Sequence, residues 1–325
     1  MGKIKSDLNF CTLFDSNYFA QGVTMINSLF RANKEAQIFV AAMDMKAYNL
    51  LSKIDDSRLR IIRIAEIEEL YKDFKNTKSS RSIPEYYYSS KGFICHYFLS
   101  KNNHLDSITY IDSDLYFFSN PQPIFDELQG ASVGITRHNF HWLCLHQKKY
   151  GVFNAGWVTF KNDKQGLQCL EDWMQDCINW CFGYLDGEKY ADQKYLNAWP
   201  KKYSGVQIIQ SKGANAAPWN IKKYSLKILK NSIHVDEDVL IFYHFSNLKK
   251  ISPKTYKTNL SRVFVRTKGI IKDRMYIPYI NELSKNEVDS LQMKINNNNN
   301  ISFFQKIRSF ERSLRTMFYK DILSI

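Results

Sequence analysis

Two carboxylates, Asp112 and Asp114, interrupt the otherwise apolar stretch SITYIDSDLYFFSNP at residues 107–121. Burying an unpaired carboxylate is costly, so each of them needs a partner. Two carboxylates at the end of a strand can hold a hard divalent cation, which prefers oxygen ligands. A charge pair on an edge strand or a helix cap would explain the local pattern equally well. A second Asp-x-Asp, at residues 236–238, lies in a polar stretch, and we interpret it as a solvated turn.

Three other segments carry polar residues at places where chemistry could occur. His244 lies at the end of the strand-like run IFYHFSNLKK and is either a ligand or a hydrogen-bonded core histidine. The small residues 154–156 interrupt the strand-like VFNAGWVTFK, which predicts either close approach by a ligand or another backbone, or a bulge. Asp192 and Gln193 open a predicted helix, where an acidic residue can also simply complement the helix dipole.

The cysteines and histidines have less specific patterns. Cys169, Trp173, Cys177 and Cys181 recur every four residues. This spacing suits metal-binding thiols or one buried helix face, and we favour the buried face because cysteine packs as a small hydrophobe. None of the six cysteines has zinc-type spacing, and we expect all of them to be free thiols. The histidines at 138, 141 and 146 could be metal ligands, or they could lie in a surface loop beside a bound phosphate. We interpret them by default as solvated loop residues.

The elements that must position these residues alternate along the first hundred positions. Strands are expected at 8–15, 37–44, 59–64 and 107–111, and helices at 18–31, 66–74 and 86–100. Strands separated by helices predict crossover connections and a mostly parallel sheet. Ligands bind beyond the carboxyl ends of such strands, where Asp15, Asp44 and Asp112 all fall. Further along, strands are expected at 131–138 and 152–161, and helices at 164–182 and 189–199.

Length and composition limit the function classes. The 325 residues contain 44% hydrophobic residues, with no stretch that suits a signal peptide or a membrane span, so we expect a cytoplasmic protein. A net charge of +13 suits nucleic acid, an anionic membrane or phosphorylated substrates. A nucleic-acid-binding surface would interleave basic and aromatic residues. Here much of the excess positive charge lies after residue 245, whereas the aromatic residues lie in the predicted core, so we expect no nucleic-acid partner. A sugar nucleotidyltransferase would carry a glycine-rich basic loop after the first strand, and CTLFDSNY is neither.

The end of the sequence forms a separate pattern. Residues 295–301, INNNNNI, predict a linker. Beyond it, apolar residues recur at helical spacing and basic residues occupy the other faces, which predicts a basic amphipathic helix over 302–325. Such a helix can lie on an anionic membrane, or it can pack on the enzyme or on a second subunit, so a homo-oligomer is compatible with the sequence. We expect residues 296–325 to be removable without loss of catalysis.

Six motifs, taken in order, resemble those of the nucleotide-diphospho-sugar transferases. They are FCTLFDSNYFAQGVTMINSLFR, YIDSDLYFFSNPQPIFDEL, FNAGWVTFKND, YADQKYLNAWP, GANAAPWN and LIFYHFSNLKK. The family comprises glycosyltransferases of the single-domain GT-A fold, related to family eight and glycogenin, and the similarity is to a bacterial branch. The resemblance implies an α/β domain over 1–250, with a mostly parallel mixed sheet flanked by helices and a Rossmann-like nucleotide-binding half. Residues 251–294 would be a C-terminal extension packed on that domain.

The resemblance also implies roles for individual residues. Thr12 and Asp15 match positions that hold the nucleotide base, and Lys91 matches a basic residue that faces the donor. The metal, Mn²⁺ or Mg²⁺, would be held by Asp112, Asp114 and His244. Further donor-binding positions are Asp112, Ser113, Asn154, Ala155, Gly156 and Lys249. Asp192 and Gln193 match the pair beside the reacting carbon. The family's usual glycine in His-Phe-x-Gly is Asn247 here.

The implied reaction is metal-dependent transfer of a sugar from a nucleotide-diphosphate donor, with UDP as the expected nucleotide. The acceptor would be a saccharide or a lipid-linked glycan in bacterial surface-glycan synthesis, which could place the enzyme on the inner face of the cell membrane. Inversion would need a general base, and Asp192 is the carboxylate that we would nominate. Retention needs no such base, and we favour it slightly.

Overall fold

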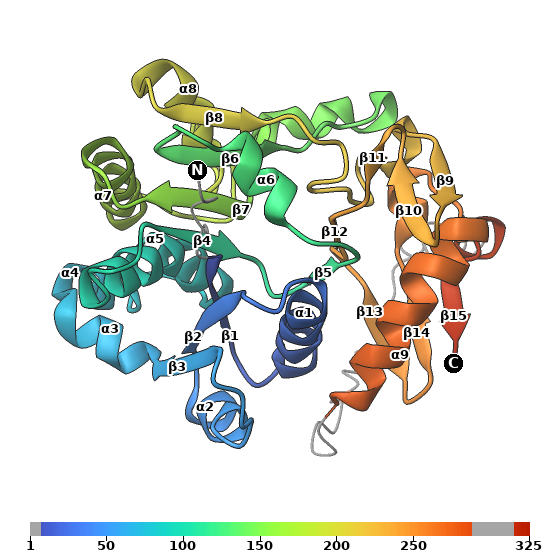
Figure 1. Cartoon of the computed structure of the whole chain (residues 1–325), viewed down its shortest axis with the longest axis horizontal. Coiled ribbons are helices and arrows are strands. Elements are labelled where there is room, and N and C mark those ends of the chain that lie inside the picture. The colour runs from blue at the N-terminus through green and yellow to red at the C-terminus, as the bar shows by residue number, and fades with distance from the viewer. Residues whose placement is uncertain (1–7, 288–314) are drawn as a thin grey trace, which may run out of the picture.

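The computed structural model describes residues 8–287 and 315–325, and its centre is a seven-stranded mixed sheet (Figure 1). The strand order is β3-β2-β1-β4-β7-β6-β8. Strand β7 runs antiparallel to both of its neighbours, and the other strand pairs are parallel. The strands are β1 (Asn9–Phe14), β2 (Gln37–Ala42), β3 (Leu59–Arg63), β4 (Ser107–Ile111), β6 (Val133–Arg137), β7 (Phe153–Lys161) and β8 (Val206–Ile209). This confirms the expected mostly parallel sheet.

The central strands are buried along their whole length because helices cover both faces of the sheet. Every residue of β1, NFCTLF, is buried, as a parallel strand between two helical layers requires. One face packs on α5 (Ile83–Lys101) and α7 (Lys164–Asn179). The other face packs on α1 (Phe19–Ala32) and on α6 (Gln122–Glu127). Two separate hydrophobic cores therefore hold the sheet in place.

Some helix boundaries differ from the expectation, and local capping explains the earlier start of α5 (Ile83–Lys101). Helix α5 begins at Ile83 instead of residue 86, because Ser82 and Glu85 form a capping box around its first turn. The helix expected at 66–74 is two helices, α3 (Ile64–Leu70) and α4 (Lys72–Thr77), which meet at Tyr71. The helix expected at 189–199 is wrong in extent: a 3-10 turn, η2 (Lys194–Asn197), precedes α8 (Trp199–Lys202).

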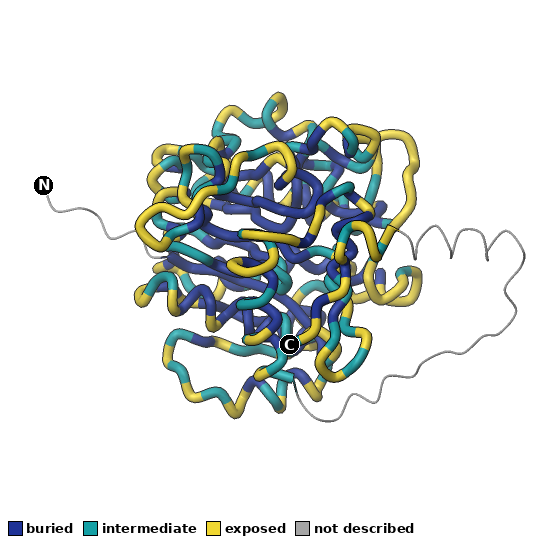
Figure 2. The backbone as a smooth tube through the Cα atoms, turned by 90° about the vertical axis from the view of Figure 1, so that its right-hand side faces the viewer, coloured by how far each residue is buried: buried dark blue, intermediate teal, exposed yellow. Residues whose placement is uncertain are grey.

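A third core joins the later part of the chain, drawn at the right of Figure 1. It contains three small sheets with the orders β11-β10-β9, β12-β5 and β13-β14-β15, together with α9 (Ile277–Lys285). The strands are β5 (Leu115–Phe117), β9 (Leu226–Leu229), β10 (Ser232–Val235), β11 (Asp238–Val239), β12 (Phe242–His244), β13 (Lys249–Ser252), β14 (Thr255–Lys257) and β15 (Ile322–Ser324). Figure 2 views this side, where exposed and intermediate segments surround a buried interior.

The expected helix over 302–325 falls largely outside the described residues. Within the described part, residues 315–319 are helical as expected, and the last residues form a strand instead. Residues 322–324 form β15, which pairs with β14. Leu323 is buried between exposed neighbours, so a two-residue alternation replaces the helical period at this end. Asp321 is also buried, so deleting residues 296–325 would remove a paired strand and a buried carboxylate from the fold. The expectation that catalysis survives this deletion stays a prediction.

The remaining helical elements are short. They are α2 (Met45–Leu51), η1 (Trp142–Tyr150), η3 (Ile221–Lys223), η4 (Leu260–Val263) and η5 (Ile271–Tyr276). All six cysteines are buried free thiols, as expected, and Cys169 and Cys177 lie on the buried face of α7. Within residues 8–287 and 315–325, no helix combines the length and the apolar character that crossing a bilayer demands.

Candidate active site

The Asp112–Asp114 segment is the turn at which the chain leaves the central sheet. Strand β4 ends at Ile111, and the Leu115 N–H donates to the Asp112 carbonyl to close the turn. Strand β5 then pairs antiparallel with β12, which places His244 opposite Leu115. The Phe245 N–H donates to the Asp114 carbonyl at 2.9 Å. A short ladder therefore brings a histidine from far along the chain next to the two carboxylates.

Asp112, Asp114 and His244 form a cluster suited to a divalent cation. His244 Nε2 lies 3.0 Å from Asp114 Oδ1 and 4.0 Å from Asp112 Oδ2. One ligand atom from each of the three residues lies within 4.8 Å of the others. A Cβ added to Gly156 would lie 2.8 Å from Asp112 Oδ2 and 3.0 Å from His244 Cε1, so only glycine leaves this space free. Two carboxylates and an imidazole are a donor set that fits Mn²⁺ or Mg²⁺.

His244 and Asp114 stabilise each other's charged forms. Burial alone would lower the pKa of His244, but the Asp114 carboxylate raises it above its usual value. Burial alone would raise the pKa of Asp114, and His244 lowers it. The two groups therefore pair as imidazolium and carboxylate when no cation is bound, and a cation would take the place of the imidazole proton.

Lys91 connects this cluster to Asp192. Its Nζ lies 3.0 Å from Asp112 Oδ1 and 3.1 Å from Asp192 Oδ2, and it donates to the Ala155 carbonyl at 3.2 Å. Burial would lower the pKa of Lys91, but the carboxylates of Asp112 and Asp192 raise it above its usual value. The buried lysine is therefore a cation that neutralises two acidic side chains.

Asp192 and Gln193 precede η2 and are held by different neighbours. Asp192 is 3% exposed, and its pKa lies above the usual value because burial outweighs the lowering effect of the Lys91 ammonium. Its backbone carbonyl accepts a hydrogen bond from Trp173 Nε1 at 2.9 Å, which fixes the segment to α7. Gln193 Nε2 donates to the Tyr150 carbonyl at 3.0 Å. The structure thus places Asp192 beside Lys91, whereas Gln193 contacts the end of η1 at Tyr150.

Residues 154–156 show both features that their small size predicted. The pairing register of β6 with β7 shifts between Ile135 and Thr136, which marks a bulge in β7. The Asp112 N–H donates to the Gly156 carbonyl at 3.1 Å, so the backbone also approaches the carboxylate turn closely. Asn154 Oδ1 accepts from the Gly156 N–H at 3.1 Å and thereby orients the bulge.

A cavity of about 1020 Å³ adjoins the cluster, and Asp114 and Lys249 are among its lining residues. Neither Thr12 nor Asp15 lines this cavity. Thr12 is buried within β1, and Asp15 is buried just after it. Asp15 accepts hydrogen bonds from the Asn17 and Tyr18 N–H groups and from Tyr87 Oη. Ser113 is half-buried at the turn. The roles of these residues in holding a nucleotide stay predictions.

Asn247 takes up the backbone conformation that a glycine would favour. Its φ is +68°, in the left-handed region, which asparagine tolerates better than most residues. Its carbonyl accepts from Asn259 Nδ2 at 2.8 Å, which ties the loop to the residues before η4. The replacement of the family's glycine is therefore compatible with the same turn.

Several neighbours of the site were not found from the sequence. Tyr110 Oη donates to Asp112 Oδ1 at 3.0 Å, and the Trp219 ring lies 5.1 Å from the His244 ring. Both occur inside quoted motifs, as TYIDSD and ANAAPWN, which was the available signal. The default interpretation of His138 and His141 as solvated is wrong, because both are buried. Burial and the neighbouring His244 lower the pKa of His138 to about 3, so it is neutral.

Two proteins of Bacillus subtilis are similar to this chain over most of its length. No family model matches the chain. The uncharacterized protein YfnD of Bacillus subtilis (strain 168) is 32% identical over 291 residues, which cover 88% of this chain and 92% of YfnD. YfnF of the same organism is 29% identical over 252 residues, covering 75% of this chain and 82% of YfnF.

The fold has a counterpart among solved structures. The galactosyltransferase LgtC, solved in complex with donor and acceptor sugar analogs, matches with a TM-score of 0.51 and 15% identity. The match covers 85% of this chain and 95% of LgtC. The chain therefore belongs to the same family as YfnD of Bacillus subtilis and has the GT-A fold of glycosyltransferases.

Proposed function

We propose that this protein transfers a sugar from a nucleotide-diphosphate donor, a UDP-sugar, to a saccharide or lipid-linked acceptor in bacterial surface-glycan synthesis. The observation that carries the proposal is the cluster of Asp112, Asp114 and His244, whose ligand atoms lie within 4.8 Å of one another. Its position on a GT-A fold, beside a cavity large enough for a nucleotide sugar, supports the proposal.

The residues of the site suggest how the reaction would proceed. Mn²⁺ or Mg²⁺ held by Asp112, Asp114 and His244 would supply Lewis-acid stabilisation of the negative charge that develops on the diphosphate. Lys249 lines the cavity with Asp114 and would bind a phosphate oxygen of the leaving group. In this proposal Asn154, Ala155 and Gly156 hold the donor sugar, while Thr12, Asp15 and Ser113 position the nucleotide.

The surroundings of Asp192 favour retention of configuration. A general base that activates an acceptor hydroxyl needs a carboxylate free to accept its proton. Asp192 is instead paired with the Lys91 ammonium at 3.1 Å. We therefore propose that Asp192 and Gln193 stabilise the developing positive charge at the reacting carbon and orient the donor.

The cation requirement provides the test. We expect UDP to bind far more tightly with Mn²⁺ than with EDTA in calorimetry, because a cation would bridge the carboxylates and the diphosphate. Asp114→Asn should abolish this difference and the transfer activity. Asp236→Asn, in the second Asp-x-Asp at the turn between β10 and β11, is the matched control and should retain both. Equal UDP affinity with Mn²⁺ and EDTA in the unaltered protein would rule out the proposed site.

A screen of nucleotide sugars by thermal unfolding would then identify the donor. A ligand present at a hundred times its dissociation constant should add about 2.7 kcal/mol to the free energy of unfolding. No stabilisation by any nucleotide diphosphate sugar in the presence of Mn²⁺ would contradict the donor class.

We also propose that the protein is cytoplasmic and binds the anionic inner face of the cell membrane through basic residues of the segment that follows residue 301. Each basic residue near an anionic surface contributes on the order of 1 kcal/mol. Lys306→Gln, Arg308→Gln and Arg312→Gln together should release the protein from anionic liposomes without loss of UDP binding. A triple variant that still floats with the liposomes would show that these residues are not the anchor.

A further inference from the structure

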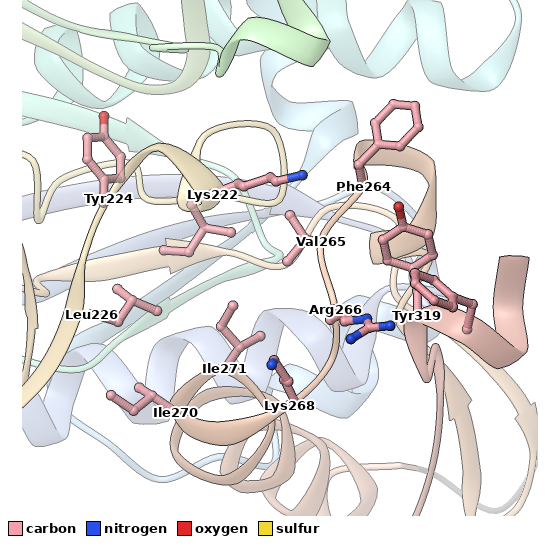
Figure 3. A pocket seen from close by; sticks show the side chains of 12 residues that line it. Lys222, Tyr224, Leu226, Phe264, Val265, Arg266, Lys268, Ile270, Ile271 and Tyr319 are labelled. Carbon is pink, nitrogen blue, oxygen red and sulfur yellow. The ribbon is translucent and has the colours of Figure 1, made fainter.

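A second cavity, of about 560 Å³, is lined by residues from three parts of the chain (Figure 3). Ile221 and Lys222 of η3 form one edge, residues 264–271 form another, and Phe318 and Tyr319 complete it. None of its lining residues belongs to the Asp112–Asp114–His244 cluster or to the cavity beside it. This pocket is therefore a separate feature that the proposed reaction does not use.

The rim of the pocket is cationic and uncompensated. Lys222, Arg266 and Lys268 are exposed, and in Figure 3 Lys222 enters from the upper edge while Lys268 enters from the lower edge. Across residues 8–287 and 315–325, no carboxylate forms an ion pair with any of these three side chains. No aspartate or glutamate lines the pocket. Three basic groups around one cavity without an acidic partner indicate a site for an anion.

The interior of the pocket is apolar. Its wall is built from aliphatic and aromatic side chains, which include Val265, Ile270, Ile271 and Phe318. Arg266 lies over the Phe318 ring at 4.0 Å, so the cationic rim and the apolar wall are in direct contact. Phe318 is 59% exposed and the adjacent Met317 is 74% exposed, so apolar surface extends from the pocket into solvent.

We propose that this pocket binds a lipid that carries a phosphate headgroup, with the phosphate at Lys222, Arg266 and Lys268 and the start of the chain along the apolar wall. Arginine and lysine pair strongly with phosphate oxygens. An alkyl chain gains free energy by covering the aliphatic side chains that line the cavity. A single ligand must supply both properties, because the two surfaces meet at Arg266.

The lining residues disfavour other anionic ligands. An acidic saccharide or a nucleobase needs hydrogen-bond partners for its hydroxyl or amide groups. The pocket offers no serine, threonine, asparagine, glutamine, aspartate or glutamate side chain, and its only hydroxyls are those of Tyr224 and Tyr319. A free inorganic anion would leave the apolar wall uncovered. A lipid phosphate satisfies the rim and the wall together.

The pocket lies close to the candidate active site along the chain. Trp219, whose ring packs against His244, precedes Ile221 by two positions. Val263, whose carbonyl lies 2.9 Å from His141 Nε2, directly precedes Phe264 of the pocket. A lipid phosphate bound in this pocket would therefore contact residues that closely follow, in the sequence, residues packed against His244 and His141. The inference does not rest on the proposed sugar transfer, since the binding test below needs no reaction.

The test uses dodecyl phosphate below its micelle concentration as the probe, with binding to the full chain measured by calorimetry. We expect dodecyl phosphate to bind at least about tenfold more tightly than inorganic phosphate or dodecanol, because each of these offers only half of the ligand. The double variant Arg266→Gln and Lys268→Gln should weaken binding by at least about tenfold, since charge-assisted hydrogen bonds are lost. UDP binding with Mn²⁺ should be unchanged in this variant.

A matched control separates the pocket from general surface charge. Lys272→Gln with Arg274→Gln removes two exposed basic residues of the neighbouring segment that do not line the pocket, and it should bind the probe as the unaltered protein does. If both double variants lose the same affinity for dodecyl phosphate, the loss is caused by the lower net charge and not by the pocket, and the proposal is overturned. If inorganic phosphate binds as tightly as dodecyl phosphate, the pocket is a site for free anions. If dodecanol binds as tightly, the pocket is a purely apolar site. Either result overturns the proposal.

Discussion

Lys91 is the residue whose loss the site should tolerate least. It lies within about salt-bridge distance of two acidic side chains, at 3.0 Å from Asp112 and 3.1 Å from Asp192, and is itself buried. A buried ion pair adds little net stability, because desolvation offsets the attraction. Removing the lysine is a different matter, since the buried Asp192 carboxylate and the half-buried Asp112 carboxylate lose the cation that they share.

Lys91→Met should therefore lower the free energy of unfolding by about 3–5 kcal/mol, measured by urea denaturation in the absence of added metal. Lys161→Met is the matched control, because Lys161 and Asp163 form a solvent-exposed pair at 3.7 Å that should contribute about 0–1 kcal/mol. Adding Asp192→Asn to Lys91→Met should restore part of the loss by removing one unpaired charge. A Lys91→Met variant as stable as the control variant would contradict this account.

The residues of the site could be predicted only in part from the sequence. Asp112 and Asp114 were visible as charges in an apolar stretch, but their approach to His244 depends on the pairing of β5 with β12. No local spacing encodes contacts between residues so far apart, and only the family resemblance predicted them. Tyr110 and Trp219 were missed because an aromatic residue in an apolar run looks like core from its sequence alone.

At the scale of elements, Glu68 joins three consecutive helices. It lies on α3 and is buried, and its Oε1 accepts from Lys78 Nζ, which follows α4, and from Tyr86 Oη on α5, both at 2.8 Å. Burial would raise the pKa of Glu68, but the hydrogen bonds from Lys78 and Tyr86 lower it below its usual value. The ionised form therefore contributes to packing α3 and α4 against α5.

This gives a pH dependence of known sign. A carboxyl whose pKa is lower in the folded state contributes stability above its unfolded pKa, near 4.3, and this contribution is lost as the pH falls through the folded value. At neutral pH, Glu68→Gln should lower the free energy of unfolding by about 1–2 kcal/mol, and the difference from the unaltered protein should shrink below about pH 4.

Glu69→Gln is the control, because Glu69 is exposed on the same helix. It should leave the free energy of unfolding nearly unchanged at every pH. A difference between the Glu68→Gln protein and the unaltered protein that stays constant from pH 7 to pH 3 would show that charge is not the cause.

The elements were predictable where the apolar pattern is long. Strand β4 was expected at its observed bounds, and β1, β2 and β3 within two residues. Strands β1, β2 and β4 are mostly apolar and buried, and β3 keeps three aliphatic residues among its five. The strands from β9 onward are only two to four residues long, which is too short for a two-residue period to be recognised from the sequence alone. Their positions follow from tertiary pairing, which single-sequence patterns do not contain.

At the scale of the whole molecule, Asp321 fixes the last strand to the rest of the fold. Its buried carboxylate accepts from the Ser261 N–H at 2.9 Å, from Thr258 Oγ1 at 3.2 Å and from Ser261 Oγ. The Thr258 N–H also donates to the Asp321 carbonyl at 2.8 Å. Residues far apart in the sequence thus share one hydrogen-bond network beneath β15.

Asp321→Ala should lower the free energy of unfolding by about 1–3 kcal/mol, because it leaves buried donors of Ser261 and Thr258 without an acceptor. Thermal or urea unfolding would measure this change. Ser324→Ala, at an exposed position of the same strand, should have an effect within about 0.5 kcal/mol of zero. If both variants have the same stability as the unaltered protein, the network does not hold the strand.

The pairing of β14 with β15 also has a consequence for the newly made chain. Lys257 pairs with Ile322, which is 65 positions later. During synthesis, β13 and β14 can form a hairpin at once, but the outer edge of β14 has no partner until residues 322–324 leave the ribosome. An unpaired strand edge is a template for pairing with other chains. Until residues 322–324 emerge, the nascent chain therefore lacks the strand that covers this edge of β14 in the folded protein.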